Sequence, residues 1–262
     1  MNAYPDVKAR FYPMITDRGQ NTASIGETGA VQVWPMDVPR DLYHTDWVTN
    51  RTLAWLGEQG KSPWFCWMSF PDPHHPWDVP RSELHRVNWR DLELPPVYLD
   101  GDEARRVLAT KPKHWLGYYE ASLWSNLESP RDYVPAGMTA DQVREINATT
   151  HIENELIDEA CQRVTNYHKA QDLYDHADIF FTTDHGELQG DYGLMFKGPY
   201  HVDALMRLPF IWKPGQKAVE PQVINEPVGH VDLAPTFCAI AGMEPRHMDG
   251  EVLPTSTDEA SR

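Results

Sequence analysis

Short apolar runs that alternate with helical stretches constrain the fold of this chain more than any other feature of its sequence. Residues 64–70 (WFCWMSF), 177–183 (ADIFFTT) and 207–212 (RLPFIW) are each short and largely apolar. Runs of this length and composition are typical of strands that are buried on both faces of a sheet. The sequence therefore predicts three such strands.

Helical stretches lie between and around these runs. One helix is expected to begin at Thr45, and a last short helix spans residues 232–241 with Pro235 in its first turn. The longest begins at Thr139, where the spacing to Gln142 matches a capping box and an apolar stripe with a period of about 3.6 follows. Strands that alternate with helices predict an α/β fold with a mainly parallel sheet flanked by helices.

The chain divides into three segments of unequal length. Residues 1–40 show no periodicity and carry scattered turn-forming glycines, so they are expected to be irregular. Residues 41–254 hold the expected strands and helices and form one domain, in which residues 71–135 give no clear pattern. Residues 255–262 are expected to form a tail.

The balance of charge limits the partners of this chain. The 262 residues carry a formal net charge of -16, with no run of Lys or Arg. A surface this acidic repels phosphate backbones, so we expect no nucleic-acid partner. The same charge suits solubility alone or, locally, a cation site. No apolar stretch approaches the length of a membrane span, so no membrane partner is expected either.

The three cysteines predict a reducing compartment. Cys66, Cys161 and Cys238 are odd in number, far apart and set in apolar sequence. They are expected to be buried free thiols rather than a disulfide framework or a zinc site. Residues 1–5 do not open a signal peptide, so the cytoplasm is the expected location, unless an export signal precedes Met1 in a longer chain.

Two polar clusters follow two of the apolar runs. In open α/β sheets the carboxyl ends of strands form the crevice in which ligands bind. Asp184-His185-Gly186 offers a carboxylate oxygen and an imidazole nitrogen side by side, a pair that can ligate a divalent cation or simply form a turn. Lys197, in the glycine-rich loop that follows, can place a point charge on an anionic oxygen beside that cation or remain solvated.

In the other cluster, Pro73 and Pro76 enclose His74 and His75. A histidine held rigidly at a strand end can donate a proton to a leaving group or hydrogen-bond an anion. The alternative is a histidine that packs under the neighbouring Trp77.

Several segments, in order along the chain, resemble the sulfatase family of the alkaline phosphatase superfamily. Residues 65–76 resemble the family's strand followed by Pro-His-x-Pro, and residues 181–199 resemble its Ser/Thr-Asp-His-Gly block with the lysine that follows. Residues 207–211 resemble its Arg-Val-Pro strand, while residues 231–236 and 249–254 resemble the closing helix and its exit. The two dense blocks are similar to the branch that holds arylsulfatases and phosphonate monoester hydrolases.

The resemblance implies a metal-dependent hydrolase of sulfate esters, whose substrate is a small anionic ester. It makes Asp184 and His185 metal ligands, with calcium as the expected cation and manganese or zinc as alternatives. It places Lys197 on the sulfate or phosphoryl oxygen of the substrate and His74 on the leaving-group side. His75 would take the place of His74 if the register slips by one residue.

The sequence departs from the family at the nucleophile. The family converts a Cys or Ser within Cys/Ser-x-Pro/Ala-x-Arg to formylglycine, and none of Cys66, Cys161 and Cys238 is followed by that pattern. The first strand with its pair of metal-binding Asp is also missing, and Tyr192 stands where the family usually has His. These departures imply a fragment of the catalytic domain that encodes no formylglycine, lacks the N-terminal nucleophile segment and the C-terminal small domain, and is inactive alone.

Three alternatives stay open. The chain can derive from a phosphonate or phosphate ester hydrolase of the same superfamily. It can derive from a phosphoryl-transfer relative with a Thr or Ser nucleophile. It can also be a non-catalytic remnant that binds an anion.

Overall fold

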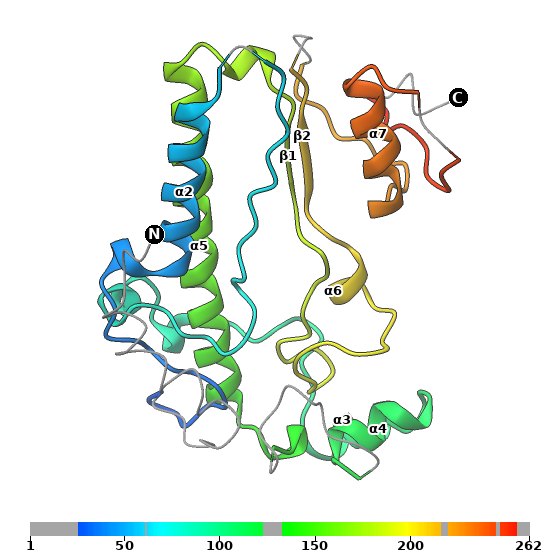
Figure 1. Ribbon diagram of the computed structural model, residues 1–262. Helices are drawn as coiled ribbons and strands as arrows, with labels where there is room; N and C mark the ends of the chain where they lie inside the picture. The colour runs from blue at the N-terminus through cyan, green and yellow to red at the C-terminus, as the bar shows by residue number, and fades with distance from the viewer. Residues whose placement is uncertain (1–25, 61, 123–132, 216–219, 245–246, 256–262) are drawn as a thin grey trace. The chain divides into compact units, whose positions relative to one another are not determined.

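A computed structural model describes residues 26–60, 62–122, 133–215, 220–244 and 247–255 (Figure 1). The chain forms two compact units. The larger unit comprises Met1–His168 and Thr182–Pro209, and the smaller unit comprises Lys169–Phe181 and Phe210–Arg262. No helix in these described ranges is long and apolar enough to cross a membrane.

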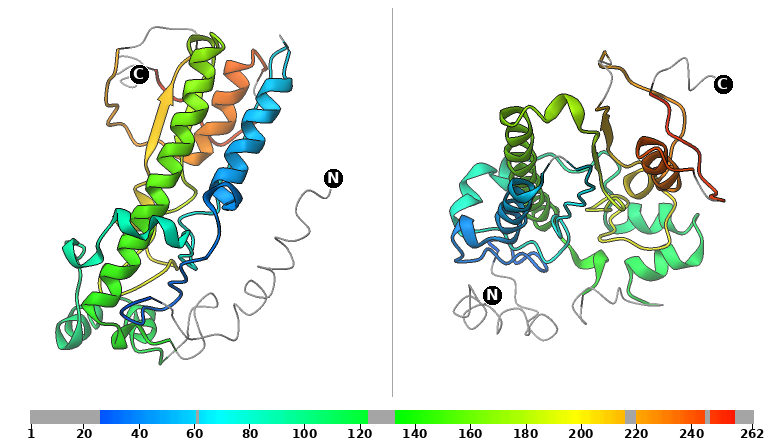
Figure 2. Two further views of the ribbon diagram at one scale, coloured as in Figure 1. Left: turned by 90° about the vertical axis from the view of Figure 1, so that its left-hand side faces the viewer. Right: turned by 45° about the horizontal axis from the view of Figure 1, so that its top comes forward.

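Two long helices, α2 (His44–Glu58) and α5 (Ala140–Ala170), lie side by side (Figures 1 and 2). The capping box predicted before α5 is confirmed. The Thr139 N–H donates to Gln142 Oε1 at 2.9 Å, and the Gln142 N–H donates to Thr139 Oγ1 at 3.2 Å. These two bonds satisfy backbone donors that a helix start otherwise leaves without partners.

Partly buried polar contacts hold α2 against α5. Arg163 of α5 donates to Asp46 at 2.9 Å and to Asn50 at 2.5 Å, both on α2. Arg40, just before α2, pairs with Asp46 at 2.7 Å and with Glu159 of α5 at 2.8 Å. The first turn of α2 is therefore fixed on the middle of α5.

The described part of residues 71–135, which excludes 123–132, contains short helices where the sequence showed no clear pattern. These helices include α3 (Gly101–Leu108) and α4 (Lys113–Tyr119).

Short helices also occur outside this stretch. One of them, α6, spans Asp203–Met206. The 3₁₀ helices found along all of the described residues are Arg40–Leu42, Arg81–Arg86, Trp89–Asp91, Pro135–Gly137, Tyr174–His176 and His230–Asp232.

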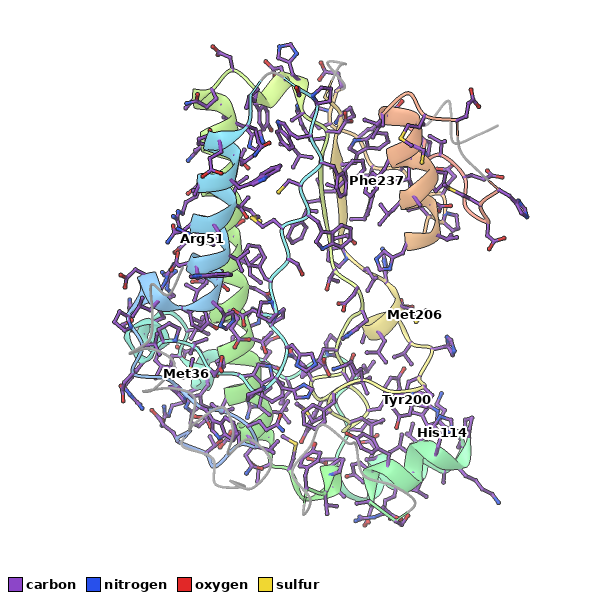
Figure 3. All side chains as sticks on the ribbon, viewed as in Figure 1. Met36, Arg51, His114, Tyr200, Met206 and Phe237 are labelled. Carbon is purple, nitrogen blue, oxygen red and sulfur yellow. The ribbon has the colours of Figure 1, made fainter. Side chains whose placement is uncertain are left out.

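The core of the larger unit is rich in aromatic side chains. Trp77 and Phe196, both fully buried, stack at a centroid distance of 6.0 Å. At another part of the same core, His114 stacks on Tyr200 at 5.4 Å (Figure 3). The buried members of this core are Ala30, Val33, Trp77, Ala104, Leu108, Trp115, Tyr118, Tyr119, Tyr133, Ile146, Leu188, Leu194, Met195, Phe196, Tyr200 and Leu205.

Two extended segments of the larger unit pair in parallel. Val33 bridges Trp77 and Met36 bridges Pro80. The Met36 N–H donates to the Val79 carbonyl at 2.8 Å within this ladder. This pairing connects the segment that follows His74 and His75 to residues 32–36, which belong to the stretch that the sequence predicts to be irregular.

The smaller unit holds β1 (Ile179–Thr182), β2 (Phe210–Lys213) and α7 (Leu233–Ile240). Phe237 of α7 contacts Phe180 of β1 edge-on at 5.1 Å (Figure 3), and Phe180 also stacks on Trp212 of β2 at 5.1 Å. The predicted final helix and two of the predicted strands are therefore confirmed. Both strands are only half-buried, whereas the sequence predicted full burial.

The expectation of a buried strand over residues 64–70 is wrong for this structure. The segment is extended, but it belongs to no strand, and Phe65 and Trp67 are 63% and 69% exposed. An apolar run is buried only where neighbouring elements cover both of its faces, and the described residues supply no partner strand here. Their sheet is the pair β1–β2, so the larger parallel sheet stays a prediction.

The cysteines differ from expectation in one respect. Cys66, Cys161 and Cys238 are free thiols, as predicted, but each is half-buried rather than buried. Partial burial raises the pKa of Cys66 and of Cys161 above the ordinary value.

Candidate functional site

Asp184 and His185 follow directly after β1, at the position that the sequence predicts. The His185 N–H donates to Asp184 Oδ1 at 2.9 Å, and His185 Nδ1 donates to the Gly186 carbonyl at 2.8 Å. The tautomer is assigned from these partners, and it leaves a lone pair on His185 Nε2. That nitrogen lies 3.7 Å from Asp184 Oδ2.

This pair fits a divalent cation, although two ligands make only part of a coordination sphere. Two donor atoms that are each about 2.1 Å from one ion lie roughly 3–4 Å apart, which agrees with the separation of His185 Nε2 from Asp184 Oδ2. Slight burial opposes ionisation of Asp184, but the His185 ring and backbone N–H groups outweigh it and lower the pKa of this carboxyl. Asp184 is therefore ready to bind a cation at neutral pH.

Residue 186 must be glycine because the backbone of α6 passes too close to it for a side chain to fit. Its N–H donates to the Leu205 carbonyl at 3.1 Å, and a Cβ at this position would lie 1.8 Å from the Ala204 carbonyl oxygen. The chain after His185 can pass α6 at this distance only if residue 186 has no side chain. The glycine thus sets the direction in which Asp184 and His185 leave β1.

A tight loop carries Lys197. The Leu188 N–H donates to the Phe196 carbonyl at 3.0 Å, and the Gly190 N–H donates to the Leu194 carbonyl at 2.8 Å. Leu188, Leu194 and Phe196 are almost completely buried and anchor the loop in the aromatic core. Lys197 follows this anchor and is half-buried.

The side chains of His74 and Lys197, one from each polar cluster, are in contact. Lys197 Nζ lies 2.8 Å from His74 Nε2, although the residues are 123 positions apart in the chain. His74 Nδ1 lies 2.5 Å from the His75 carbonyl oxygen, so Nδ1 carries the proton. Nε2 is consequently the acceptor, and the Lys197 ammonium donates to it.

The two adjacent histidines have different surroundings. His74 is exposed, whereas His75 is 5% exposed and contacts the Phe196 ring edge-on at 4.5 Å. The ring of Trp77 lies 5.8 Å from that of His75. His75 therefore packs against Trp77, which was the alternative considered for these histidines. His74 is the histidine that faces solvent.

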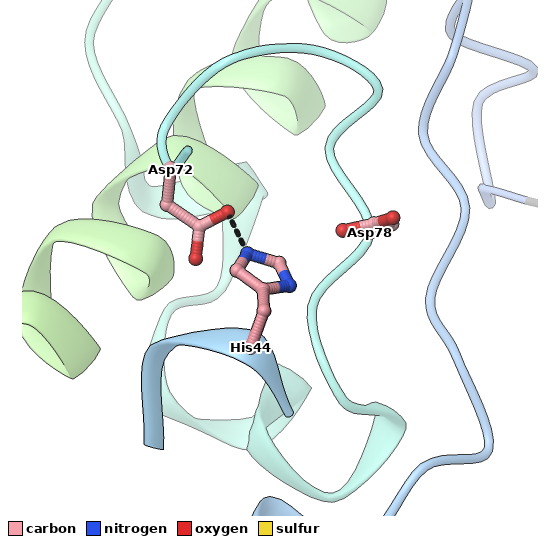
Figure 4. A group of neighbouring side chains, drawn as sticks. All are labelled: His44, Asp72 and Asp78. Carbon is pink, nitrogen blue, oxygen red and sulfur yellow. Dashed lines mark hydrogen bonds and ion pairs between the residues drawn. The ribbon is translucent and has the colours of Figure 1, made fainter. Parts of the chain in front are cut away.

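A further group was not found by sequence reasoning. His44, Asp72 and Asp78 each place one possible ligand atom within 4.8 Å of the others (Figure 4). Asp72 lies in the cluster with His74, but no spacing links it to His44, 28 residues earlier. No sequence signal could have joined these residues, because the fold alone brings them together.

Comparison with known proteins places this geometry in context. A family model described as Sulfatase matches residues 6–243. An Escherichia coli (strain K12) protein described as an uncharacterized sulfatase is 28% identical over 207 residues, which is 78% of this chain and 37% of that protein. An extracellular sulfatase SULF-1 homolog of Drosophila melanogaster is 30% identical over 220 residues, covering 81% of this chain and 18% of that protein.

Solved structures share the fold. A phosphonate monoester hydrolase from Silicibacter pomeroyi matches 95% of this chain and 50% of its own length, with a TM-score of 0.75 and 22% identity. The corresponding enzyme of Agrobacterium radiobacter matches 94% of this chain and 48% of its own length, with a TM-score of 0.71 and 23% identity. The chain thus spans half or less of the length of each of these four proteins.

Proposed function

The chain belongs to the sulfatase family, and from this premise we propose that it carries the substrate-binding side of a metal-dependent hydrolase of sulfate esters. The observation that carries the proposal is the contact of 2.8 Å between Lys197 Nζ and His74 Nε2. It places an ammonium group beside an exposed imidazole. The ammonium group can bind the anionic oxygens of an ester, and the imidazole can protonate its leaving group.

Asp184 and His185 would hold the cation through Oδ2 and Nε2. When bound, the cation polarises the esterified oxyanion as a Lewis acid. Calcium is the proposed ion for a sulfate ester, with manganese or zinc as alternatives, since one carboxylate and one imidazole suit each of them. With two ligands from this chain, we expect weak binding, nearer millimolar than micromolar in order of magnitude.

Lys197 and His74 would divide the work on the substrate. A sulfate oxygen is a stronger acceptor than a neutral imidazole, so an incoming ester draws the Lys197 ammonium away from His74 Nε2. Nε2 is then free to take up a proton and to deliver it to the departing alkoxide. Lys197 stabilises the charge that develops on the sulfate oxygens. His75 is too enclosed by Phe196 and Trp77 to replace His74 in this role.

The nucleophile is the part of the mechanism for which this sequence offers no residue. No Cys or Ser stands in Cys/Ser-x-Pro/Ala-x-Arg within the 262 residues. We therefore expect the chain by itself to bind the ester without hydrolysing it, because binding alone lowers no barrier unless it favours the transition state. A non-catalytic anion-binding remnant would share this behaviour.

A phosphonate or phosphate ester is the second candidate substrate. It is favoured by the two solved structures of phosphonate monoester hydrolases that share the fold. The proposed contacts of Lys197 and His74 suit either anion, so the comparison of both esters belongs to the test.

Binding of 4-nitrophenyl sulfate to the full chain tests the role of Lys197. Replacement by methionine (K197M) should weaken binding by about 10- to 150-fold, because a charge-assisted hydrogen bond contributes about 1.5–3 kcal/mol. The exposed Lys113 supplies the control, and K113M should bind as the parent does. Equal affinities of K197M and the parent in titration calorimetry would remove Lys197 from the site.

Hydrolysis assays complete the test. The chain should show no turnover of aryl sulfates or aryl phosphonates above background with any metal. Extension at the N-terminus by the nucleophile segment of a family member should restore turnover of one ester class, and Lys197→Ala should then abolish most of it. Turnover by the 262-residue chain that is lost on Asp184→Ala would contradict the proposal, since a residue within the chain would then act as nucleophile.

A further inference from the structure

A second group in the larger unit, which we call the buried acidic group, consists of the half-buried His44 and the buried Asp72, Asp78 and Glu153. His44 Nε2 lies 2.5 Å from Asp72 Oδ1 (Figure 4). Thr45 Oγ1 donates to Asp72 Oδ2 at 2.7 Å. Asp72, Asp78 and Glu153 are 8%, 6% and 0% exposed. Three carboxylates are thus withdrawn from water beside one imidazole.

A small apolar cluster holds these side chains together. Its buried members are Tyr43, Val79, Ile152 and Leu156. His44 follows Tyr43 at the start of α2, Asp78 precedes Val79 in the parallel ladder, and Glu153 follows Ile152 on α5. Packing among the apolar neighbours therefore fixes where three elements, far apart in sequence, present their polar groups.

The described residues support the buried carboxylates unequally. Asp72 accepts from Thr45 and lies at the N-terminus of α2, where the helix dipole favours a negative charge. Neither carboxylate oxygen of Glu153 accepts a hydrogen bond of good geometry from any residue that the structure describes, and the Asp78 backbone gives this carboxylate only weak support. An ionised carboxylate buried without a partner is strongly unfavourable.

The neighbouring charges increase this cost. Burial raises the pKa of Glu153 well above its usual range, Asp72 and Asp78 raise it further, and the Asp78 backbone opposes the rise. Burial also raises the pKa of Tyr43, and the same three carboxylates add to that rise. Glu153 is therefore near enough to Asp72 and Asp78 for both charges to act on it. One proton would neutralise a single carboxylate, whereas a shared dication offsets two charges and satisfies the oxygens of Glu153.

We propose that His44, Asp72, Asp78 and Glu153 bind one divalent transition-metal ion, Mn²⁺ or Zn²⁺. An imidazole with several carboxylates suits these ions, whereas Ca²⁺ prefers a shell made of oxygen alone. Donors on opposite sides of an ion with bonds of about 2.1 Å lie about 4 Å apart, so His44, Asp72 and Asp78, whose possible ligand atoms lie within 4.8 Å of one another, need only small side-chain shifts. Glu153 lies outside that group and would have to move toward it to complete the site.

The ion has a structural role in this proposal. It cross-links the first turn of α2, the loop after Pro71 and the middle of α5. His74 lies two residues after Asp72 in that loop, so the ion also steadies the segment that presents His74 to Lys197. This metal site does not include Asp184 or His185. The proposal of this site is therefore independent of whether the chain takes part in ester hydrolysis.

Manganese binding separates the two sites. The test uses the full chain with Asp184→Asn and His185→Ala, so that the buried acidic group is the candidate ligand set that remains among the described residues. Titration calorimetry and Mn²⁺ electron paramagnetic resonance should show one ion per chain, and Mn²⁺ or Zn²⁺ should raise the Tm. Adding Glu153→Gln should weaken Mn²⁺ binding at least tenfold and remove most of the rise in Tm.

Glu155 provides the matched control, because it lies exposed on the same helix. Glu155→Gln should leave Mn²⁺ affinity unchanged. Without metal, Glu153→Gln should melt no lower than its parent, because the glutamine amide matches the protonated carboxyl in size and is neutral, and Asp78→Asn repeats the test if that variant does not fold. The proposal is overturned if the Asp184→Asn, His185→Ala chain binds no Mn²⁺, or if Glu153→Gln binds it as tightly as its parent.

Discussion

Two groups of this chain each pair a histidine with an aspartate, but the two aspartate side chains differ in their exposure to solvent. The Asp184 side chain is 85% exposed, and its partner His185 is the next residue in the chain. The Asp72 side chain is 3% exposed, and its partner His44 comes 28 residues earlier on another element. The two histidines are similarly exposed, at 31% for His44 and 37% for His185, so the pairs differ in whether the carboxylate is open to solvent or enclosed by the fold.

The difference separates groups made by local sequence from groups made by packing. Asp184 and His185 need only a strand end and a glycine to lie together, so their removal should disturb the fold little. Asp72 satisfies buried donors on α2, so its removal leaves polar groups stranded inside the protein. Accessible groups are suited to binding and exchange of substrate, whereas enclosed groups mainly determine stability.

The largest expected effect is on the buried carboxylate. Asp72→Ala should lower the free energy of unfolding by about 3 kcal/mol, since it leaves His44 and the buried Thr45 hydroxyl without their acceptor. Asp184→Ala should change it by no more than about 0.5 kcal/mol, as is usual for surface positions. Urea unfolding of both variants measures the difference, and equal losses would abolish the distinction between the two groups.

An intermediate effect is expected where the exposed pair depends on the backbone. Gly186→Ala should cost about 2 kcal/mol, because the new Cβ would lie 1.8 Å from the Ala204 carbonyl oxygen and force the chain to shift. Gly60→Ala, where no atom lies within 4 Å of the new Cβ, is the control and should be neutral within about 0.5 kcal/mol. Thermal melts that show no difference between the two would mean that α6 does not constrain the turn.

The smallest effect concerns two threonines that support the two carboxylates. Thr45 is 1% exposed and donates to Asp72 at 2.7 Å, whereas Thr183 donates to Asp184 at a longer 3.3 Å. Thr45→Val should therefore cost about 1 kcal/mol, and Thr183→Val less than about 0.5 kcal/mol. The isosteric changes preserve packing, so chemical denaturation reports the hydrogen bonds, and a larger loss for Thr183→Val would reverse the comparison.

The sequence alone determined features that depend on neighbouring residues in the chain. The capping box at Thr139 and Gln142 and the final helix with Pro235 were predicted and are present in the structure. The placement of Asp184 and His185 after a strand was also predicted. Hydrogen bonds between residues three or four positions apart, and the rigidity of proline, act within one segment whatever surrounds it.

Only the tertiary structure decided features that depend on distant segments. It determined that His74 rather than His75 meets Lys197, because Phe196 and Trp77 enclose His75. It left residues 64–70 partly exposed despite their apolar sequence, since burial is supplied by neighbouring elements. It also assembled the buried acidic group from α2, the loop after Pro71 and α5. Apolar packing places those elements, and it carries polar side chains into contacts that no sequence spacing encodes.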